Sequence, residues 1–374
     1  MTVATALVSG NDPLPQIAEA AVGEALAKAR LAQANGILLF LTPEFARHAQ
    51  QAVTAAARAA QCTQVAGAVV SGVFNETGWA VDRPAAAVMV FGGSLSLTHS
   101  VAGDAPILSY SGATFPPEWG ESGARFGGSF GDSFAGGAAY TEAVVWQQSR
   151  LTSPPRCSLQ IIGAQVDIAV SSGLQLLSEA QSVDASNGYD LERLGGQAAL
   201  KSLNRALPSE IRQHMAQQLH HLAAVLIEGA GDAEKALAEG RFRAVAIIAL
   251  NADNSLTLAE RVVAGQRLAW AIRQPASAEA DMRQVIGRLG EHLARPACAL
   301  VFSCIGRGPY FYGGEDRDLA VLRERFPGLP LLGSYGTGQI AATQGGAEMR
   351  NRQLQNAVVT ALISPEEAHV HPIA

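Results

Sequence analysis

Cysteine is scarce in this sequence: its 374 residues include only four, and no two form a Cys-x-x-Cys pair. Neither a disulfide framework nor a structural zinc site is predicted, because both depend on regularly spaced cysteines. Charged residues are also few, at 16% of the chain, and no run of Lys and Arg could neutralise a line of phosphates. With a net charge of −6 as well, we expect no nucleic-acid partner.

Long hydrophobic runs and nucleotide-binding motifs are missing too. No uncharged apolar stretch approaches the ~20 residues needed to cross a bilayer, and the N-terminus lacks a charged segment followed by an apolar one. Neither Gly-x-x-x-x-Gly-Lys nor Gly-x-Gly-x-x-Gly occurs. These absences disfavour secretion, membrane insertion and a nucleotide enzyme, and we expect a cytoplasmic protein.

Apolar residues, in contrast, are plentiful, at 48% of the chain. That share is enough to build cores, and a chain of this length predicts two domains because single cores stop growing beyond ~250 to 300 residues. The segment Ser153–Arg156 contains two prolines and marks the break between them. The predicted domains are residues 1–155 and 156–374.

The first of these parts alternates helical and strand patterns, which is typical of a mixed α/β fold. A strand at Val3–Val8, a helix at Gln16–Ala34 and the apolar strand Ile37–Leu41 are predicted in turn. Thr42 is expected to cap a helix over Pro43–Ala60. Further strands are predicted at Val65–Val70, Ala85–Phe91, Ile107–Ser111 and Ala138–Gln147. A glycine-rich connection between strands is predicted at Gly127–Gly131.

The second part continues the mixture of elements. Its predicted strands are Cys157–Val170, Ala299–Ser303, Leu331–Ser334 and Ala357–Ile363, with a hairpin that joins Phe242–Leu250 to Ser255–Val262. Its predicted helices are Gly196–Arg205, Ser209–Ile227, Ser277–His292 and Asp316–Phe326.

One plan of elements occurs twice. Ile37–Leu41 leads through a helix to Val65–Gly72, and Ala299–Ser303 leads through a helix to Leu331–Gly338. Both end segments contain an apolar pair, a glycine, three residues, a hydroxyl residue and a glycine. We therefore predict two related α/β halves that arose by duplication; the alternative is a chance similarity between two strand ends.

Three blocks resemble the FIST family of intracellular sensory proteins. The C-terminal block consists of Phe302–Gly308, Phe326–Gly333, Tyr335–Ile340 and Leu354–Asn356. The middle block consists of Val170–Gly173, Asn187–Leu191 and Ala198, and is similar to the junction between the family's N-terminal and C-terminal parts. The first block, Leu38–Pro43 with Val65–Gly72, follows the family's pattern of apolar strand, helix and glycine-bearing strand end.

The resemblance implies a sensory protein with an N-terminal and a C-terminal FIST part that binds a small polar ligand, such as an amino acid. Two positions depart from the family's usual residues: Gln339 stands where Glu is frequent, and Gln355 where His is frequent. Losing a carboxylate and an imidazole changes the charge that a pocket accepts, so the family's ligand preference does not carry over directly.

Three polar residues of the C-terminal block are candidate ligand contacts. Gln339 and Asn356 carry uncharged amides, which recognise polar groups without titrating; alternatively, they serve a turn and a sheet end. Arg307 lies between two glycines beyond a buried strand, where its planar fork suits a carboxylate or phosphate. Its alternative role is to brace the loop through backbone carbonyls.

The remaining candidates are small residues and one thiol. Ser71 and Gly72, together with the run Tyr335–Gly338 (Tyr335, Gly336, Thr337 and Gly338), let the main chain approach a ligand, or else mark bulges and tight bends. Cys304 lies close to Arg307, so a lowered pKa would make it reactive; the alternative is an inert buried thiol.

Three function classes remain open at this stage. A stand-alone sensory module would bind a small molecule and signal to a separate protein, with homo-oligomers possible. A haem-based nitric-oxide-type sensor would use one of eight histidines, none of which has a diagnostic spacing. An enzyme would use Cys304 or Arg307 on a small carboxylate or phosphoryl substrate. The first class, without catalysis and without a cofactor, is the one that the motifs favour.

Overall fold

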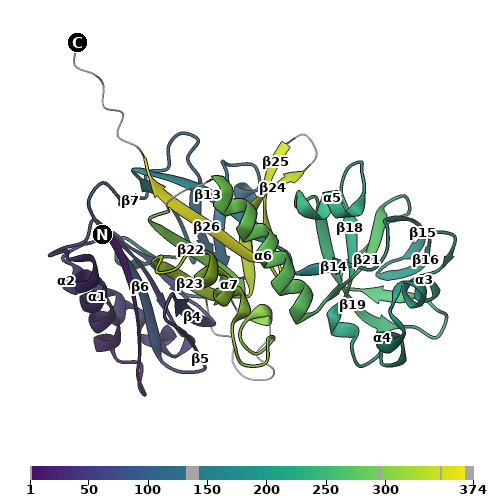
Figure 1. The fold of residues 1–374 in the computed structure, drawn as a ribbon, viewed down its shortest axis with the longest axis horizontal. Coiled ribbons are helices and arrows are strands. Elements are labelled where there is room, and N and C mark those ends of the chain that lie inside the picture. The colour runs from purple at the N-terminus through teal and green to yellow at the C-terminus, as the bar shows by residue number, and fades with distance from the viewer. Residues whose placement is uncertain (1, 132–142, 293–295, 346–347, 367–374) are drawn as a thin grey trace, which may run out of the picture. The chain divides into compact units, whose positions relative to one another are not determined.

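The computed structural model describes residues 2–131, 143–292, 296–345 and 348–366, and the chain divides into two compact units (Figure 1). Unit 1 contains residues 1–171, 283–342 and 351–374; unit 2 contains residues 172–282 and 343–350. The proposed boundary between residues 155 and 156 falls inside unit 1, because strands from both ends of the chain share its sheets. The predicted sequence domains therefore do not coincide with these compact units.

The first sheet of unit 1 is built from the N-terminal part of the chain. Its strands, in the order β1-β6-β2-β3-β10-β11, are β1 (Val3–Ser9), β6 (Ala85–Phe91), β2 (Gly36–Leu41), β3 (Val65–Val69), β10 (Val145–Gln147) and β11 (Arg150–Leu151). The helices α1 (Pro15–Ala29) and α2 (Ala49–Ala60) pack on one face, where their alanines meet Ile37, Leu39 and Leu41. All six residues of β2 are buried, which explains its continuously apolar sequence.

The second sheet of unit 1 combines strands from both ends of the sequence. Its strands, in the order β13-β26-β22-β23-β4-β5, are β13 (Ala164–Ser171), β26 (Val358–Pro365), β22 (Cys298–Cys304), β23 (Leu331–Gly336), β4 (Gly72–Asn75) and β5 (Trp79–Val81). Two further elements follow β22, namely η4 (Ile305–Arg307) and α7 (Arg317–Arg325).

The first two sheets share an order of strand directions. In each, two antiparallel pairings lead to a parallel pair, β2 with β3 and β22 with β23, and an antiparallel hairpin follows beside it. This common order agrees with the repeated plan in the sequence. A duplication is a statement about ancestry, and the two related halves stay a prediction.

The third sheet contains the glycine-rich segment, and it belongs to unit 1 except for the described residues of 343–350 in two of its strands, which are assigned to unit 2. Its strands, in the order β25-β24-β9-β8-β12-β7, are β25 (Glu348–Leu354), β24 (Gly338–Gly345), β9 (Arg125–Ser129), β8 (Ile107–Ser111), β12 (Arg156–Ile162) and β7 (Ser96–Thr98). The expectation of a connection at Gly127–Gly131 is wrong for Gly127–Ser129, which belong to β9. Of the strand predicted at Ala138–Gln147, residues 138–142 lie outside the described part.

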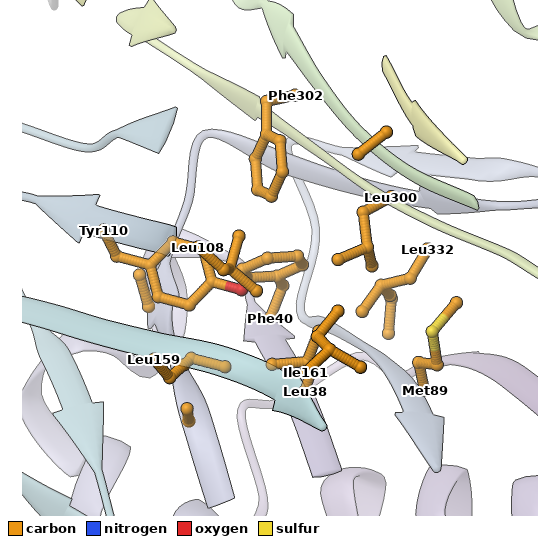
Figure 2. Packing of buried hydrophobic residues seen from close by; sticks show 14 of the residues in the cluster. Leu38, Phe40, Met89, Leu108, Tyr110, Leu159, Ile161, Leu300, Phe302 and Leu332 are labelled. Carbon is orange, nitrogen blue, oxygen red and sulfur yellow. The ribbon is translucent and has the colours of Figure 1, made fainter. Parts of the chain in front are cut away.

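A single apolar core joins the three sheets of unit 1. Figure 2 shows side chains from β2, β6, β8, β12, β22 and β23 converging there, and their buried members include Leu38, Phe40, Met89, Leu108, Tyr110, Leu159, Ile161, Leu300, Phe302 and Leu332. Phe40 forms edge contacts with Tyr110 and Phe302 at centroid distances of 5.5 and 6.1 Å. Such aromatic contacts help to specify one packing of the sheets.

Unit 2 contains a closed barrel of six antiparallel strands. Following the hydrogen-bonded pairs leads from β18 (Leu222–Ile227) through β21 (Arg267–Arg273), β15 (Gln181–Asn187), β16 (Asp190–Leu194), β20 (Leu256–Leu258) and β19 (Phe242–Leu250) back to β18. Closure satisfies the backbone groups that an open sheet edge would expose. Trp270 lies fully buried in the barrel core, and its Nε1 donates to Ser202 Oγ at 3.0 Å.

The remaining elements are short, apart from one helix. They are β14 (Leu174–Leu176), β17 (Gln197–Ala198), α3 (Ala199–Ala206), α4 (Ser209–Gln213), α5 (Ala233–Ala238), α6 (Pro275–His292), η1 (Pro43–His48), η2 (Pro117–Trp119) and η3 (Leu219–His221). None of the helices within the described ranges is both long and apolar enough to span a membrane.

Three predicted helices need correction. The helix expected at Ser209–Ile227 ends at Gln213, and its apolar end is strand β18, since a short apolar run does not distinguish a strand from a buried helix. The first helix ends at Ala29, where Arg30 adopts a left-handed conformation. Thr42 caps no helix: η1 follows it, and Thr42 Oγ1 accepts a hydrogen bond from Ala85 N at 2.9 Å.

Candidate functional site

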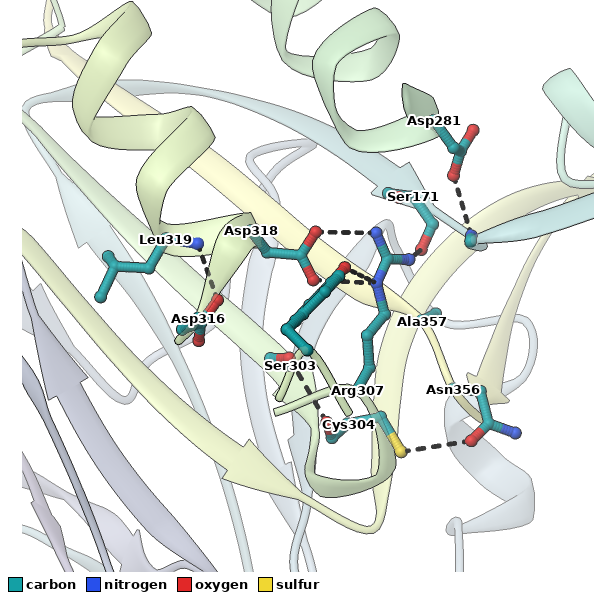
Figure 3. Close-up of polar contacts among 12 residues, drawn as sticks. Ser171, Asp281, Ser303, Cys304, Arg307, Asp316, Asp318, Leu319, Asn356 and Ala357 are labelled. Atoms are coloured by element: carbon teal, nitrogen blue, oxygen red, sulfur yellow. Dashed lines mark hydrogen bonds and ion pairs between the residues drawn. The ribbon is translucent and has the colours of Figure 1, made fainter. Parts of the chain in front are cut away.

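Most of the predicted ligand contacts gather where the parallel strands β22 and β23 end. Cys304, the last residue of β22, is paired in register with Gly336, the last residue of β23. Gln339 follows in β24, and Asn356 precedes β26, whose Val358 pairs with Ser303 of β22. We call Cys304, Gln339, Asn356 and Ala357 the strand-end cluster; Figure 3 shows three of its residues beside Arg307.

Gln339 contributes a buried amide to the strand-end cluster. Its side chain has no exposed surface, and its Oε1 accepts a hydrogen bond from Ala357 N at 3.3 Å. Its Nε2 has no hydrogen-bond partner among the described residues. A buried donor without a partner destabilises a protein by about 1 to 3 kcal/mol. This nitrogen is therefore the group in the cluster that is most in need of an external acceptor.

Asn356 and Cys304 form the other side of the strand-end cluster. Cys304 is 6% exposed, and its Sγ lies 3.7 Å from Asn356 Oδ1, a distance at which a thiol donates a weak hydrogen bond (Figure 3). Asn356 has a positive φ of 58°, which asparagine tolerates better than most residues. The structure thus places Cys304 among the buried thiols, with an amide oxygen as its neighbour.

Arg307 is enclosed and already paired. It has no exposed surface, and its Nε and Nη2 each donate to a carboxylate oxygen of Asp318 at 2.9 Å, while Nη1 donates to Ser171 O at 3.2 Å. Asp318 occupies the place that a ligand's carboxylate would take (Figure 3). The proposed role as an anion anchor is therefore corrected: Arg307 braces the end of β13 from within.

Burial sets the charge state of this ion pair. Burial raises the pKa of Asp318 to about 6, although the neighbouring Arg307 opposes that rise. Burial alone would lower the pKa of Arg307, but the Asp318 carboxylate holds it above its ordinary value. At neutral pH both groups are charged, and a pair of opposite charges buried together needs this bidentate geometry to offset its desolvation.

Tyr335 is occupied by contacts within unit 1. Its hydroxyl donates a short hydrogen bond to Asp316, and its ring packs against Phe74 at a centroid distance of 4.7 Å. Asp316 also accepts from Leu319 N at 2.8 Å and so caps α7. Burial raises the pKa of Asp316, and burial next to this carboxylate raises that of Tyr335. Tyr335 thus serves the core more than a ligand.

The predicted glycines bring protein strands close to one another. A Cβ on Gly72 would lie 2.7 Å from Val81 Cγ2, one on Gly336 would lie 2.9 Å from Ser129 O, and one on Gly338 would lie 2.4 Å from Gln353 Nε2. These contacts fit the interpretation as tight bends. Two hydroxyl residues lie beside these glycines: Ser71 N donates to Tyr335 O at 2.9 Å, and Thr337 Oγ1 donates to Gly131 O at 3.0 Å.

The sequence missed the acidic partners of this region. Asp316 and Asp318 were assigned only to the start of a helix, although they bond Tyr335 and Arg307. The sequence signal for these partners was a pair of acidic residues at the start of a helix. Helices on a protein surface begin with the same pattern, so it does not indicate buried partners. Ser171 contributes its carbonyl and Tyr312 its hydroxyl as acceptors for Arg307, and no sequence pattern predicts either contact.

The equivalent strand end of the first sheet is less polar. Thr42 N donates to Ala85 O there, as Cys304 N donates to Ala357 O in the second sheet. Thr42 Oγ1 bonds Ala85 N at 2.9 Å, whereas Gln339 supplies that bond to Ala357 N. Three residues beyond Thr42 lies the fully buried Phe45; three residues beyond Cys304 lies the equally buried Arg307. Only the second strand end therefore combines a thiol, two amides and an ion pair.

These features define a mixed α/β protein with an antiparallel barrel and a polar strand-end cluster. Residues 199–342 match the family model of the FIST C domain, which is associated with sensory and signalling proteins. The match includes Cys304, Arg307 and Gln339 of the C-terminal block. It leaves out residues 1–198 and 343–374, so the N-terminal part of the resemblance, and Asn356 in the C-terminal block, rest on their motifs alone.

The chain is also similar to mycobacterial proteins. It is 28% identical over 180 residues to the uncharacterized protein Mb0898c of Mycobacterium bovis, covering 47% of this chain and 46% of that protein. It is 26% identical over 192 residues to the uncharacterized protein Rv0628c of Mycobacterium tuberculosis, covering 50% of this chain and 49% of that protein. The chain spans about half the length of the curated relatives that it matches.

Proposed function

We propose that this protein is a cytoplasmic sensory module that binds a small polar ligand at the strand-end cluster and signals to a separate protein. The observation that carries the proposal is the buried Nε2 of Gln339, which lacks an acceptor among the described residues. The FIST C domain supports the sensory class. The polar composition of this strand end, compared with its counterpart at Thr42, supports the location.

The free group of Gln339 sets the chemistry of the ligand. Because Oε1 is engaged by Ala357 N and Nε2 is not engaged, the side chain would donate a hydrogen bond rather than accept one. A carboxylate or carbonyl oxygen is the matching group, as in an amino acid. The proposal includes no catalytic step, since amides neither gain nor lose a proton near neutral pH.

A thermal-shift screen against amino acids and small organic acids tests this function. A ligand at a hundred times its Kd stabilises a protein by about 2.7 kcal/mol. We expect a shift with one class of compound that Gln339→Glu abolishes, because glutamate keeps the acceptor for Ala357 N but removes the free donor.

Gln160→Glu provides the matched control for a buried charge. Gln160 is 3% exposed and has both ends of its amide bonded, to the backbone of Ala102 and Ala105, so its variant should lose stability but keep the ligand response. The proposal fails if the Gln339→Glu variant responds like the wild type, or if no compound shifts the wild type. A Soret band in the purified protein would indicate the haem class instead.

A further inference from the structure

A hollow of unit 1 lies between α2 and the hairpin of β10 and β11. Its volume is about 690 Å³, within the usual range of ligand sites, ~300 to 1,000 Å³. The residues that matter for its chemistry are Ala57, Arg58, Gln61, Gln148, Arg150 and Leu151. We call this hollow the α2 groove.

The walls of the α2 groove are held in place by hydrogen bonds. Gln50 of α2 donates from Nε2 to Ser149 O at 2.9 Å and accepts from Leu151 N at 3.1 Å, so it fastens the hairpin to the helix. Ser149 Oγ donates to Thr63 O at 2.8 Å on the other side. The hollow therefore has a defined shape before any ligand enters it.

The charge of the α2 groove has one sign. Arg58 and Arg150 are both exposed and line it, and no acidic residue among those that the structure describes does so. Neither arginine has an ion-pair partner within the described ranges. Both guanidinium groups are therefore available to an anionic group that enters the hollow.

One feature of the α2 groove opposes an anion. Helix α2 ends there, and a helix C-terminus carries partial negative charge. Two of the terminal carbonyls are already engaged, since Gln61 N donates to Arg58 O and Cys62 N donates to Ala57 O, both at 3.1 Å. Two full positive charges outweigh the ~0.5 charge of the helix end.

We propose that the α2 groove binds a small organic anion, with Arg58 and Arg150 holding its carboxylate or phosphate. Arginine's planar fork matches both groups, and the amides of Gln61 and Gln148 add polar contacts to the rest of the ligand. Ala57 and Leu151, which is 43% exposed, offer apolar surface for its organic body. This site shares no residue with the strand-end cluster.

Saturation-transfer NMR with benzoate, phenyl phosphate and the neutral benzamide tests this site on the full chain. We expect both anions to bind saturably and benzamide to bind at least tenfold more weakly. Arg58→Gln combined with Arg150→Gln should lower the affinity for the anions by about tenfold, as the loss of two exposed charge pairs implies. Added salt should weaken binding of the wild type.

Arg47→Gln is the matched control, because Arg47 is an exposed arginine just before α2 that does not line the groove. That variant should bind like the wild type. Equal binding of benzamide and benzoate, wild-type affinity in the double variant, or no saturable signal from either anion would each overturn the proposal. All these outcomes are independent of the Gln339 test, since they use different residues and probes.

Discussion

Arg307 and Asp318 form an ion pair in which the two side chains are 0% and 5% exposed, with 2.9 Å between Nε and Oδ2. In the first sheet the equivalent position is Phe45, also fully buried. A buried ion pair seldom stabilises a fold more than apolar residues of similar volume. Its presence beside the strand-end cluster is thus a feature that stability alone does not explain.

Breaking this pair should be far more harmful than replacing it. Asp318→Leu leaves the Arg307 charge buried without its partner, so we expect the free energy of unfolding to fall by about 3 to 5 kcal/mol. The double variant with Arg307→Met should recover most of that loss, because no charge remains. Urea denaturation measures both. A double variant as unstable as Asp318→Leu would show that the pair itself stabilises unit 1.

The carboxyl of Asp316 predicts an unusual pH dependence. Burial raises its pKa above the value of about 3.9 expected in the unfolded chain, so the folded state holds the proton to higher pH. Stability then falls as pH rises through the window between these two values. Asp316→Asn removes this titration, so the wild type should lose stability relative to the variant as pH rises above about 4.

Asp253 supplies a control of the opposite sign. Hydrogen bonds from the backbone and side chain of Ser255 lower the pKa of Asp253, so its contribution to stability should be lost as pH falls through the lowered value. The stability of Asp253→Asn should therefore be closest to that of the wild type at acidic pH. Chemical denaturation across pH measures both variants. Equal slopes for Asp316→Asn and the wild type would contradict the assignment.

The two equivalent strand ends should respond differently to valine. Thr42→Val removes the acceptor of Ala85 N and leaves that buried donor unpaired, at an expected loss of about 1 to 3 kcal/mol. Cys304→Val should lose less, because Gln339 still accepts from Ala357 N. Denaturation midpoints of the two variants check this difference. If Cys304→Val lost as much stability as Thr42→Val, the Cys304 thiol would have to make further hydrogen bonds besides the one to Asn356.

Asn351 fastens the loop around η2. Its Nδ2 donates to Trp119 O and Gly123 O, both at 2.7 Å, and its Oδ1 accepts from Arg125 N at 2.8 Å. Asn351→Ala removes three hydrogen bonds, so the free energy of unfolding should fall by about 2 to 4 kcal/mol. Hydrogen exchange in residues 117–125 should become faster. Exchange mass spectrometry measures the effect.

Asn35 is the control for Asn351, since it makes two similar bonds to Gly93 O and Leu95 O on an exposed side chain. Asn35→Ala should lose less stability, because water replaces the lost partners. If exchange in residues 117–125 were unchanged in Asn351→Ala, the loop would be held by its own contacts, among them the Arg125 guanidinium over the Trp119 ring at 4.5 Å.

The sequence predicted elements well where apolar periodicity was long or tightly bounded. The strands at Ile37–Leu41 and Ala299–Ser303 and the helix at Ser277–His292 are confirmed within two residues. Pairing between distant segments was not predictable. β4 joins β23 of the C-terminal part, with Leu332 opposite Asn75, and no local pattern selects that partner.

The candidate site was predictable as a region but not as a set of contacts. Gln339 and Asn356 were singled out by resemblance, and the structure brings both to one strand end. The occupied fork of Arg307 was hidden, because Asp318 lies eleven positions further on across a loop. Likewise, only the backbone of Ala357 reveals which half of the Gln339 amide is free.

The mixed origin of the second sheet has a consequence during synthesis on the ribosome. Glu76, just after β4, bonds Leu331 N across 255 positions, so β4 emerges long before β23 does. At ~5 to 20 residues per second, the delay is on the order of ten to fifty seconds. Throughout it, β4 presents an unpaired edge that other nascent chains can join. Fragments that stop before β22 should therefore aggregate, and chaperone supply should limit the yield of the full chain.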